Sequence, residues 1–363
     1  MKYDAILLTS FGGPEAVDEV MPFLERVTAG RGVPRERLES VAEHYLHFDG
    51  VSPINDQNQA LLAKMREEFA LRGLDLPIYW GNRNSEPYFA STLKQIYEDG
   101  HQKILTFVTS AYSSYSGCRQ YRENLALALH ESGLDGKLSI DKVRHYFDHP
   151  GFVGPFAASL INSLNQAKRV GLQNSEIKIY FTTHSIPMSM AETSGPESSR
   201  GKYLGGSYVA QHMASAKEIM KLVEVKLGFP LPEWELVYQS RSGAHTIPWL
   251  EPDINDAIVE SSSRGFKGVI LAPIGFISDH LEVLWDLDNE AKATAEAHSL
   301  FFSRVPTPGI DEKFVKAIVD LIDERVNGAS IESLSDLGPW PGVCEVNCCP
   351  NPRGTLPAVA QSQ

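Results

Sequence analysis

The sequence has no excess of positive charge and no long apolar run. Its 33 lysine and arginine residues are outnumbered by 46 aspartate and glutamate residues, which gives a formal net charge of −13. A protein that binds nucleic acid or an anionic lipid surface needs a basic patch, and the sequence contains no basic run. The longest apolar run, GVILAPIGFI at 268–277, is too short to cross a bilayer. The composition therefore predicts no nucleic-acid partner and no membrane insertion.

The N-terminal segment MKYDAILLTSFGG lacks the features of a secretory signal, because no basic region precedes a long apolar stretch and no small-residue cleavage site follows. We therefore expect a cytoplasmic protein, and a monomer. Cysteine is scarce, and three of the four cysteines fall close together near the end of the chain, at Cys344, Cys348 and Cys349, with Cys118 far upstream. In a reducing compartment, such a cluster indicates metal ligands rather than disulfides.

A nucleotide site is also disfavoured. The segment SFGGP (10–14) places two glycines directly after a predicted strand, which is where a phosphate-binding loop begins. It lacks both the G-x-G-x-x-G and the G-x-x-x-x-G-K-[ST] pattern. We interpret it as a tight turn.

Short apolar runs alternate with helix-like stretches along the whole chain, which is typical of βαβ units around mostly parallel sheets. The predicted strands are AILLTS (5–10), PIYWG (77–81), KILTFVTS (103–110), KIYFTT (178–183), WELVYQS (234–240) and GVILAPI (268–274). The predicted helices are 57–72, 88–99, 119–131, 151–168, 208–227 and 311–327.

The predicted strands also repeat in the same order. The matching segments are ILLTSFGGP (6–14) with IYFTTHSIP (179–187), YWGNRNS (79–85) with YQSRSG (238–243), and KILTFVTSAY (103–112) with KGVILAPIGF (267–276). The repeat predicts an α/β fold of two similar halves, at 1–148 and 149–328, followed by an irregular extension at 329–363. Ligands of such sheets bind beyond the carboxyl ends of the strands, where the first alignment sets Phe11 opposite His184 in a cleft between the halves.

His184 lies in FTTHSIP, at the end of a predicted strand. One interpretation is a buried histidine that is satisfied by hydrogen bonds, and the other is a reactive group in the cleft.

A row of carboxylates follows in FISDHLEVLWDLDNE (276–290), where Ser278 is a suitable N-cap for a helix. Spacings of three and four place the carboxylates on one helix face, at Asp279, Glu282, Asp286 and Glu290. Leu281, Leu284 and Trp285 then lie on the opposite, core-facing side. No lysine or arginine occurs within 268–290. The row is either a solvated acidic face or a path for a cation.

Several of these segments together resemble the ferrochelatases, which insert ferrous iron into a porphyrin. The segments that carry the resemblance are LLTSFGGP, DGVSPIN (49–55), TTHSIP (182–187), YQSRSG (238–243) and FISDHLEVLWDLD (276–288). The resemblance implies two Rossmann-like halves with the active site in the cleft between them, which agrees with the repeat. It also implies transient contact with neighbouring enzymes of the heme pathway.

The resemblance assigns the catalytic roles to His184 and Glu282, placed across the porphyrin plane from each other. Metallation must remove two pyrrole protons and strip water from Fe²⁺, so an imidazole and a carboxylate can share the roles of base and metal donor. Glu282, Asp286 and Glu290 match an acidic path by which the metal reaches the site. The resemblance also implies that the enzyme holds the macrocycle in a ruffled shape, which points the pyrrole lone pairs at the incoming ion.

The resemblance also implies substrate contacts at Ser52 and Tyr121, and at Tyr45 by a weaker match. Phe11 stands where some relatives carry a tyrosine that can ligate iron. Phenylalanine cannot ligate, so Phe11 is expected to pack against the macrocycle.

Some ferrochelatases bind a [2Fe–2S] cluster through three cysteines of a C-terminal extension and one in the body of the protein. Cys344, Cys348, Cys349 and Cys118 match that set, so a cluster that ties the tail to the core is expected. Four thiolates also suit tetrahedral zinc, and free thiols are the third alternative.

The choice of porphyrin depends on the segment that borders the cleft, which we call the lip. The segment GRGVPRERLESVAEHY (30–45) is polar and charged, and its Arg31, Arg35, Arg37 and His44 can meet carboxylates. This favours coproporphyrin III, which carries four propionates, with Fe-coproporphyrin III (coproheme) as the product. The alternatives are protoporphyrin IX or another metal, and a non-catalytic iron–sulfur sensor on the same fold.

Overall fold

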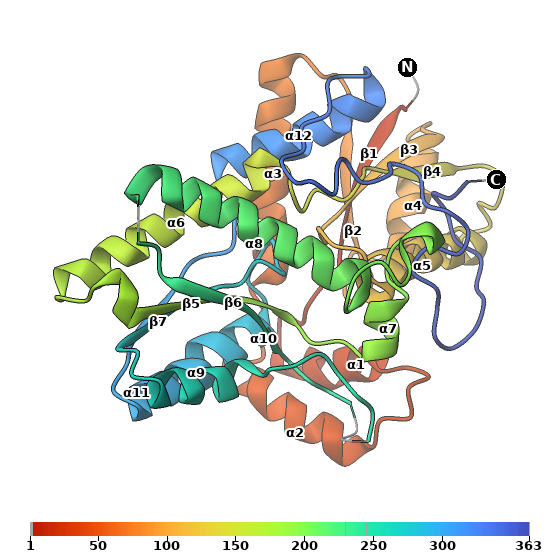
Figure 1. Ribbon diagram of the computed structural model, residues 1–363. Helices are drawn as coiled ribbons and strands as arrows, with labels where there is room; N and C mark the ends of the chain where they lie inside the picture. Colours follow the sequence, from red (N-terminus) through yellow and green to blue (C-terminus); the bar gives the residue numbers. More distant parts are fainter. Residues whose placement is uncertain (1–2, 229, 244–245, 363) are drawn as a thin grey trace.

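A computed structural model describes residues 3–228, 230–243 and 246–362, and in these ranges the chain forms two four-stranded parallel sheets (Figure 1). The first sheet has the order β2-β1-β3-β4. Its strands are β1 (Ala5–Ser10), β2 (Ile78–Asn82), β3 (Lys103–Val108) and β4 (Ser139–Lys142). Five of the six residues of β3 and all six of β1 are buried, as expected for parallel strands that helices cover on both faces.

The second sheet has the equivalent order β6-β5-β7-β8 and is also parallel. Its strands are β5 (Ile177–His184), β6 (Glu233–Gln239), β7 (Gly268–Ala272) and β8 (Phe301–Arg304). Each aligned segment of the sequence repeat thus occupies the same place in its own sheet. The prediction of two similar α/β halves is confirmed, while β4 and β8 escaped prediction because both are short.

The helices that surround the sheets are α1 (Val17–Val27), α2 (Arg35–Leu46), α3 (Ile54–Arg72), α4 (Phe89–Glu98), α5 (Gln120–Glu131), α6 (Pro150–Arg169), α7 (Met188–Glu192), α8 (Gly206–Leu227), α9 (Ile254–Ser263), α10 (Leu281–Val283), α11 (Lys292–Ala297) and α12 (Glu312–Val326). The six predicted helices correspond to α3, α4, α5, α6, α8 and α12, with ends within three residues. Within the described ranges, none of these helices combines the length and apolar character needed to cross a membrane.

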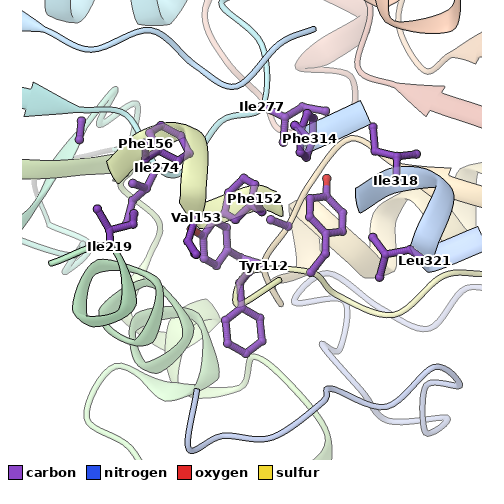
Figure 2. Close-up of a cluster of buried hydrophobic side chains, with 14 of the residues drawn as sticks. Tyr112, Phe152, Val153, Phe156, Ile219, Ile274, Ile277, Phe314, Ile318 and Leu321 are labelled. Atoms are coloured by element: carbon purple, nitrogen blue, oxygen red, sulfur yellow. The ribbon is translucent and has the colours of Figure 1, made fainter. Parts of the chain in front are cut away.

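A continuous hydrophobic core joins the two sheets. Helix α6 packs against α8 and α12, and α12 also packs against α3 of the N-terminal half. Figure 2 shows the aromatic centre of this core, where Phe152 and Phe156 of α6 meet Tyr112 and Phe314. The boundary near residue 148 falls just before α6 and stays a prediction.

Helices α1 and α2 form a separate lobe, at the bottom of Figure 1, that packs against α10 of the C-terminal half. Phe23 of α1 and Tyr45 of α2 share a buried cluster with Leu281 of α10. This contact brings the lip segment to the carboxyl ends of β5 and β7.

The extension beyond α12 forms no helix and no regular strand in its described part, as predicted, and runs beside α5 (Figure 1). Two arginines at the start of α5 hold it. Arg119 donates to the carbonyls of Val346 and Leu356 at 2.6 and 3.1 Å, and the buried Arg122 donates to the carbonyl of Val359 at 2.8 Å.

Candidate active site

His184 and Glu282 form the centre of the site. His184 is the last residue of β5, and Glu282 lies in α10, which follows β7 in the same sheet. His184 Nε2 is 3.6 Å from Glu282 Oε2, and the two side chains are 32% and 48% exposed. His184 Nδ1 hydrogen-bonds to the carbonyl of Ser185, so Nδ1 carries the proton and donates it. The lone pair of Nε2 is therefore directed at Glu282 and solvent, where it can take a proton or bind a metal.

The short His184–Glu282 distance corrects one expectation. A flat macrocycle between two side chains requires about 7 Å, because each face needs a van der Waals contact of about 3.5 Å. At 3.6 Å the two side chains leave no room for a macrocycle between them in this structure.

The helix after β7 starts later than predicted. Its N-cap is His280 rather than Ser278, and a π-helix from Leu284 to Ala291 follows α10. Asp279 lies before the helix, where it pairs with Arg304 at the end of β8 at 3.1 Å. Asp279 therefore does not belong to the acidic row.

The row that remains consists of Glu282, Asp286 and Glu290. Desolvation is the main cause that raises the pKa of Asp286 to about 7; the charges of Glu282 and Glu290 act in the same direction, and the hydrogen bonds from Ser240 and Gln239 oppose them. Glu290 is exposed and accepts a hydrogen bond from Trp285 Nε1 at 2.9 Å. The row thus leads from exposed Glu290 through half-buried Asp286 to the His184–Glu282 pair.

The core-facing side of this helix also differs from the prediction. Leu281 is buried as expected, but the other buried positions are Val283 and Leu287 instead of Leu284 and Trp285. The cause is the π-helix, which rotates successive residues relative to α-helical spacing. Trp285 is half-buried and stacks on His44 of α2, with ring centroids 4.1 Å apart.

Phe11 and Tyr45 lie beside the pair. Phe11 directly follows β1 and is half-buried, with its ring 6.1 Å from that of Phe23. Tyr45 is buried and packs on the same Phe23 ring at 5.9 Å. Desolvation raises the pKa of Tyr45, and the nearby Glu282 contributes to this shift. The apolar and acidic parts of the site are therefore adjacent.

Ser52 and Tyr121 lie on the N-terminal half. Ser52 is buried, and its backbone N–H donates to the carbonyl of Pro14 at 2.9 Å. Tyr121 is buried in α5, where the guanidinium of Arg83 stands 4.8 Å from its ring centroid. The same guanidinium is 5.3 Å from the Phe11 ring. Arg83 therefore links two of the predicted substrate contacts, Phe11 and Tyr121.

The lip arginines differ in their surroundings. Arg35 is exposed and pairs with glutamates of α1 and α2, and Arg37 is exposed. Arg31 is exposed as well, but desolvation lowers its pKa, and the charge of Glu282 opposes that shift.

The four cysteines come together at a second place. Cys118 lies in a π-helix (Tyr115–Arg119) before α5, and the three tail cysteines close over it. All four side chains are buried, and none forms a disulfide. Cys349 has a φ of 51°, a left-handed conformation that is strained for cysteine and allows it to point to the same centre as Cys348. Hydrogen bonds from Cys118 and Cys348 hold the pKa of Cys344 well below its usual value.

The thiols are arranged as a ring rather than as a tetrahedron. Cys118 contacts Cys344 and Cys349, and Cys348 contacts the same two, with 3.8 Å between the sulfurs of Cys348 and Cys349. Among the described residues, the one group of at least three ligating side chains with all ligand atoms within 4.8 Å of one another is His149, Asp320 and Glu332. The thiols are not such a group, so their sulfurs are spread wider than the mutual distances of about 3.8 Å around a tetrahedral zinc ion.

Sequence reasoning missed the site contacts of Arg83, Ser240, Trp285 and Arg304. Arg83 and Ser240 come directly after β2 and β6, within two of the repeat segments, so their position after a strand was a usable signal. The contacts of Trp285 and Arg304 depend on tertiary packing and leave no local pattern in the sequence.

Comparison with known proteins gives the same family throughout. A family model described as Ferrochelatase matches residues 3–326. The chain is 52% identical to the coproporphyrin III ferrochelatase of Leifsonia xyli over 99% of this chain and 94% of that protein. It is 52% identical to the coproporphyrin III ferrochelatase of Streptomyces coelicolor (99% and 96%) and 46% identical to the ferrochelatase of Rhodopirellula baltica (96% and 93%).

Among solved structures, Bacillus subtilis SirB with Fe³⁺ is similar to this chain with a TM-score of 0.50 at 10% identity. The match covers 89% of this chain and 96% of SirB. At this identity the likeness concerns the fold alone, and it agrees with the two-sheet architecture.

Proposed function

Because this chain belongs to the ferrochelatase family, we propose that it inserts Fe²⁺ into coproporphyrin III to form Fe-coproporphyrin III in heme biosynthesis. The observation that carries the proposal is the His184–Glu282 pair, in which Nε2 and a carboxylate oxygen lie 3.6 Å apart at the end of β5. The names of the relatives from Leifsonia xyli and Streptomyces coelicolor support coproporphyrin III as the substrate.

The reaction requires acceptors for two pyrrole protons and a group that delivers the metal. His184 Nε2 takes one pyrrole proton, since its Nδ1–H is fixed on the Ser185 carbonyl and only Nε2 is free to accept. Glu282 offers a carboxylate oxygen to Fe²⁺ and, once the ion has passed to the pyrrole nitrogens, takes the second proton. Asp286 and Glu290 supply further oxygen ligands along the path of the hydrated ion, and Phe11 packs against the macrocycle.

Substitution of each member of the pair tests the site. We expect His184→Ala and Glu282→Gln to lower kcat for iron insertion by at least about 100-fold, because each removes a base or ligand, while the Kd for porphyrin changes little. The exposed His298 and Glu296 of the α11 region provide matched controls, His298→Ala and Glu296→Gln. Full activity in both pair variants would show that the site is misassigned.

Substrate choice is tested by anaerobic Fe²⁺ insertion, followed by absorbance, with coproporphyrin III and protoporphyrin IX in parallel. The proposal expects a higher kcat/KM for coproporphyrin III. A higher value for protoporphyrin IX would keep the enzyme class and overturn the substrate. Absence of turnover with both would favour a non-catalytic sensor.

We further propose that Cys118, Cys344, Cys348 and Cys349 hold a [2Fe–2S] cluster. The gathering of four buried thiols supports it, because four cysteine thiolates are the usual ligands of such a cluster and their sulfurs are spread wider here than around a zinc ion. When bound, the cluster joins the tail to the start of α5, and the pair at His184 needs no electron from it. Iron, sulfide and zinc analysis of the purified protein tests the assignment. About two iron and two sulfide per chain are expected, and one zinc per chain would contradict it.

A cytoplasmic location, a monomeric state and transient contacts with other enzymes of the pathway stay predictions from the sequence.

A further inference from the structure

Three arginines from distant parts of the chain lie in one region at the edge of the site, where Arg83 donates to the carbonyl of Ser116 at 3.5 Å and Arg353 donates to the neighbouring Tyr115 Oη at 3.3 Å. Arg31 lies between α1 and α2, Arg83 follows β2, and Arg353 lies in the tail shortly after Cys349. Burial lowers the pKa of Arg31, and the nearby charges of Arg353 and Arg83 lower it further. Glu282 acts on the same guanidinium in the opposite direction. The three positive groups therefore share one region at the edge of the site.

In the described part of the chain, no carboxylate lies within 4.0 Å of any of the three guanidinium groups, although many other arginines form such pairs. Arg83 instead donates to Asn124 Oδ1 at 2.8 Å and stands over the Phe11 and Tyr121 rings. In a protein with a net charge of −13, three adjacent arginines without an acidic partner form a site for an anion. Guanidinium groups suit a carboxylate, which they can bind in a bidentate manner.

The position of Arg353 is fixed by a buried network. Its guanidinium donates to Tyr115 Oη at 3.3 Å and lies 5.4 Å from the centre of that ring. Its backbone N–H donates to Asn351 Oδ1 at 2.9 Å. Tyr115 and Asn351 both donate to the same oxygen of buried Glu123, at 3.2 and 3.0 Å. Arg353 is thus held at its backbone and at its guanidinium, and it stays exposed, so a ligand can reach it from solvent.

The network is attached to the thiol site on both sides. Tyr115 begins the π-helix that contains Cys118. On the tail side, Cys349 N donates to the carbonyl of Gly195 and Gly195 N donates to Cys349 Sγ, each at 3.1 Å. Asn351 and Arg353 follow shortly after Cys349, whose two hydrogen bonds to Gly195 fix this part of the tail. Displacement of either Cys118 or Cys349 would therefore move Arg353.

We propose that Arg353 binds a propionate of the porphyrin together with Arg31 and Arg83, so that the cysteine-bearing tail forms part of the substrate site and the thiol site holds Arg353 in place. This inference rests on the proposed function, because it takes the porphyrin as substrate. It gives the tail a role in binding that does not require electron transfer.

The first experiment measures the Kd of the full-length, metal-loaded protein for coproporphyrin III by porphyrin fluorescence, without added Fe²⁺. Arg353→Ala is expected to weaken binding about tenfold, through loss of one charge-assisted hydrogen bond. Arg353→Lys should recover part of the loss. The control Arg169→Ala removes the same charge from an exposed position at the end of α6 and should stay within about twofold of the unaltered protein.

A neutral porphyrin distinguishes the loss of a charge contact from a disturbance of the packing of the tail. The tetramethyl ester of coproporphyrin III has no carboxylate, so its Kd should not distinguish Arg353→Ala from the unaltered protein. An equal loss with the ester would show that the substitution disturbs the fold of the tail rather than a propionate contact, and would overturn the assignment.

The second experiment tests the connection to the thiol site. Cys349→Ser should weaken coproporphyrin III binding by about the same factor as Arg353→Ala, and the double variant should bind no worse than either single variant. An unchanged Kd in Cys349→Ser, or losses that multiply in the double variant, would contradict positioning by the thiol site.

The measurements distinguish a failure of this inference from a failure of the proposed function. An unaltered protein that binds and metallates coproporphyrin III, with an unchanged Kd in Arg353→Ala, overturns this inference alone. An unaltered protein that binds the porphyrin but inserts no iron overturns the proposed function alone.

Discussion

At the scale of single residues, histidines in this chain are of two kinds. His184 keeps Nε2 free at a partly exposed strand end. His212 of α8 is fully buried, stacks on the ring of Tyr112 at 3.5 Å, and hydrogen-bonds through Nδ1 to the carbonyl of Tyr208. Desolvation lowers the pKa of His212 to about 3. His184 therefore offers Nε2 to the site, whereas His212 is part of the core.

The depressed pKa of His212 predicts a contribution to acid sensitivity. Below pH about 6.5 the unfolded chain binds a proton at this side chain, whereas the folded chain does not until pH about 3. Stability is therefore lost as the pH falls through this window. We expect His212→Phe, which keeps the stacking on Tyr112, to reduce the loss of unfolding free energy between pH 7 and pH 5 by roughly 1–2 kcal/mol. Urea unfolding at the two pH values measures this, and identical losses in both proteins would contradict it.

At the scale of elements, the decisive feature is the π-helix that follows α10. It directs Asp286 inward, toward Ser240 and Gln239 at the end of β6, and leaves Glu290 at the surface. Arg304 forms ion pairs with Asp279 and Asp288, the two carboxylates that do not belong to the row of Glu282, Asp286 and Glu290. The carboxylates without a cationic partner are thus the ones that lead to the catalytic pair.

This arrangement predicts a specific effect on the use of iron. Glu290→Gln keeps an acceptor for Trp285 Nε1 but removes the outermost charge of the path. We expect the KM for Fe²⁺ to rise about threefold at low ionic strength, with less effect at high salt and none on the KM for porphyrin. Glu260→Gln on α9, which removes a surface charge beside Arg264, is the control. A rise in KM for porphyrin instead would place Glu290 in the substrate site.

The elements also explain what could be predicted from the sequence. Buried parallel strands appear in a sequence as apolar runs. The sequence therefore predicted β1, β3, β5 and β7 and the repeat that they form. The start of the helix at Leu281 was not, because Asp279 looks like a first-turn residue until Arg304 is folded against it. The placement of His184 and Glu282 side by side depends on the distance between two strand ends, which no local pattern encodes.

At the scale of the whole molecule, the C-terminal part of the chain returns to the N-terminal half. Helix α12 packs on α3, where Arg72 pairs with Asp320 at 2.6 Å. The tail then crosses α5, where Arg119 and Arg122 donate to its carbonyls. Between Trp340, which packs on Phe147, and Val359, which packs on the core of the first sheet, the four buried thiols anchor the tail.

Removal of the metal from the thiol site should therefore loosen the tail before the rest of the molecule. Loss of a ligand that binds only the folded state lowers stability by mass action. We expect the melting temperature to fall by about 5 °C or more, and trypsin to cleave after Arg353 at least about tenfold faster. Cleavage after Arg169 on α6, far along the chain from the thiols, should keep its rate and serves as the internal control. Cys344→Ser should reproduce both effects without a chelator. If cleavage after Arg353 is equally slow with and without metal, then Arg119, Arg122 and Glu123 hold the tail by themselves, and the thiol site is not its anchor.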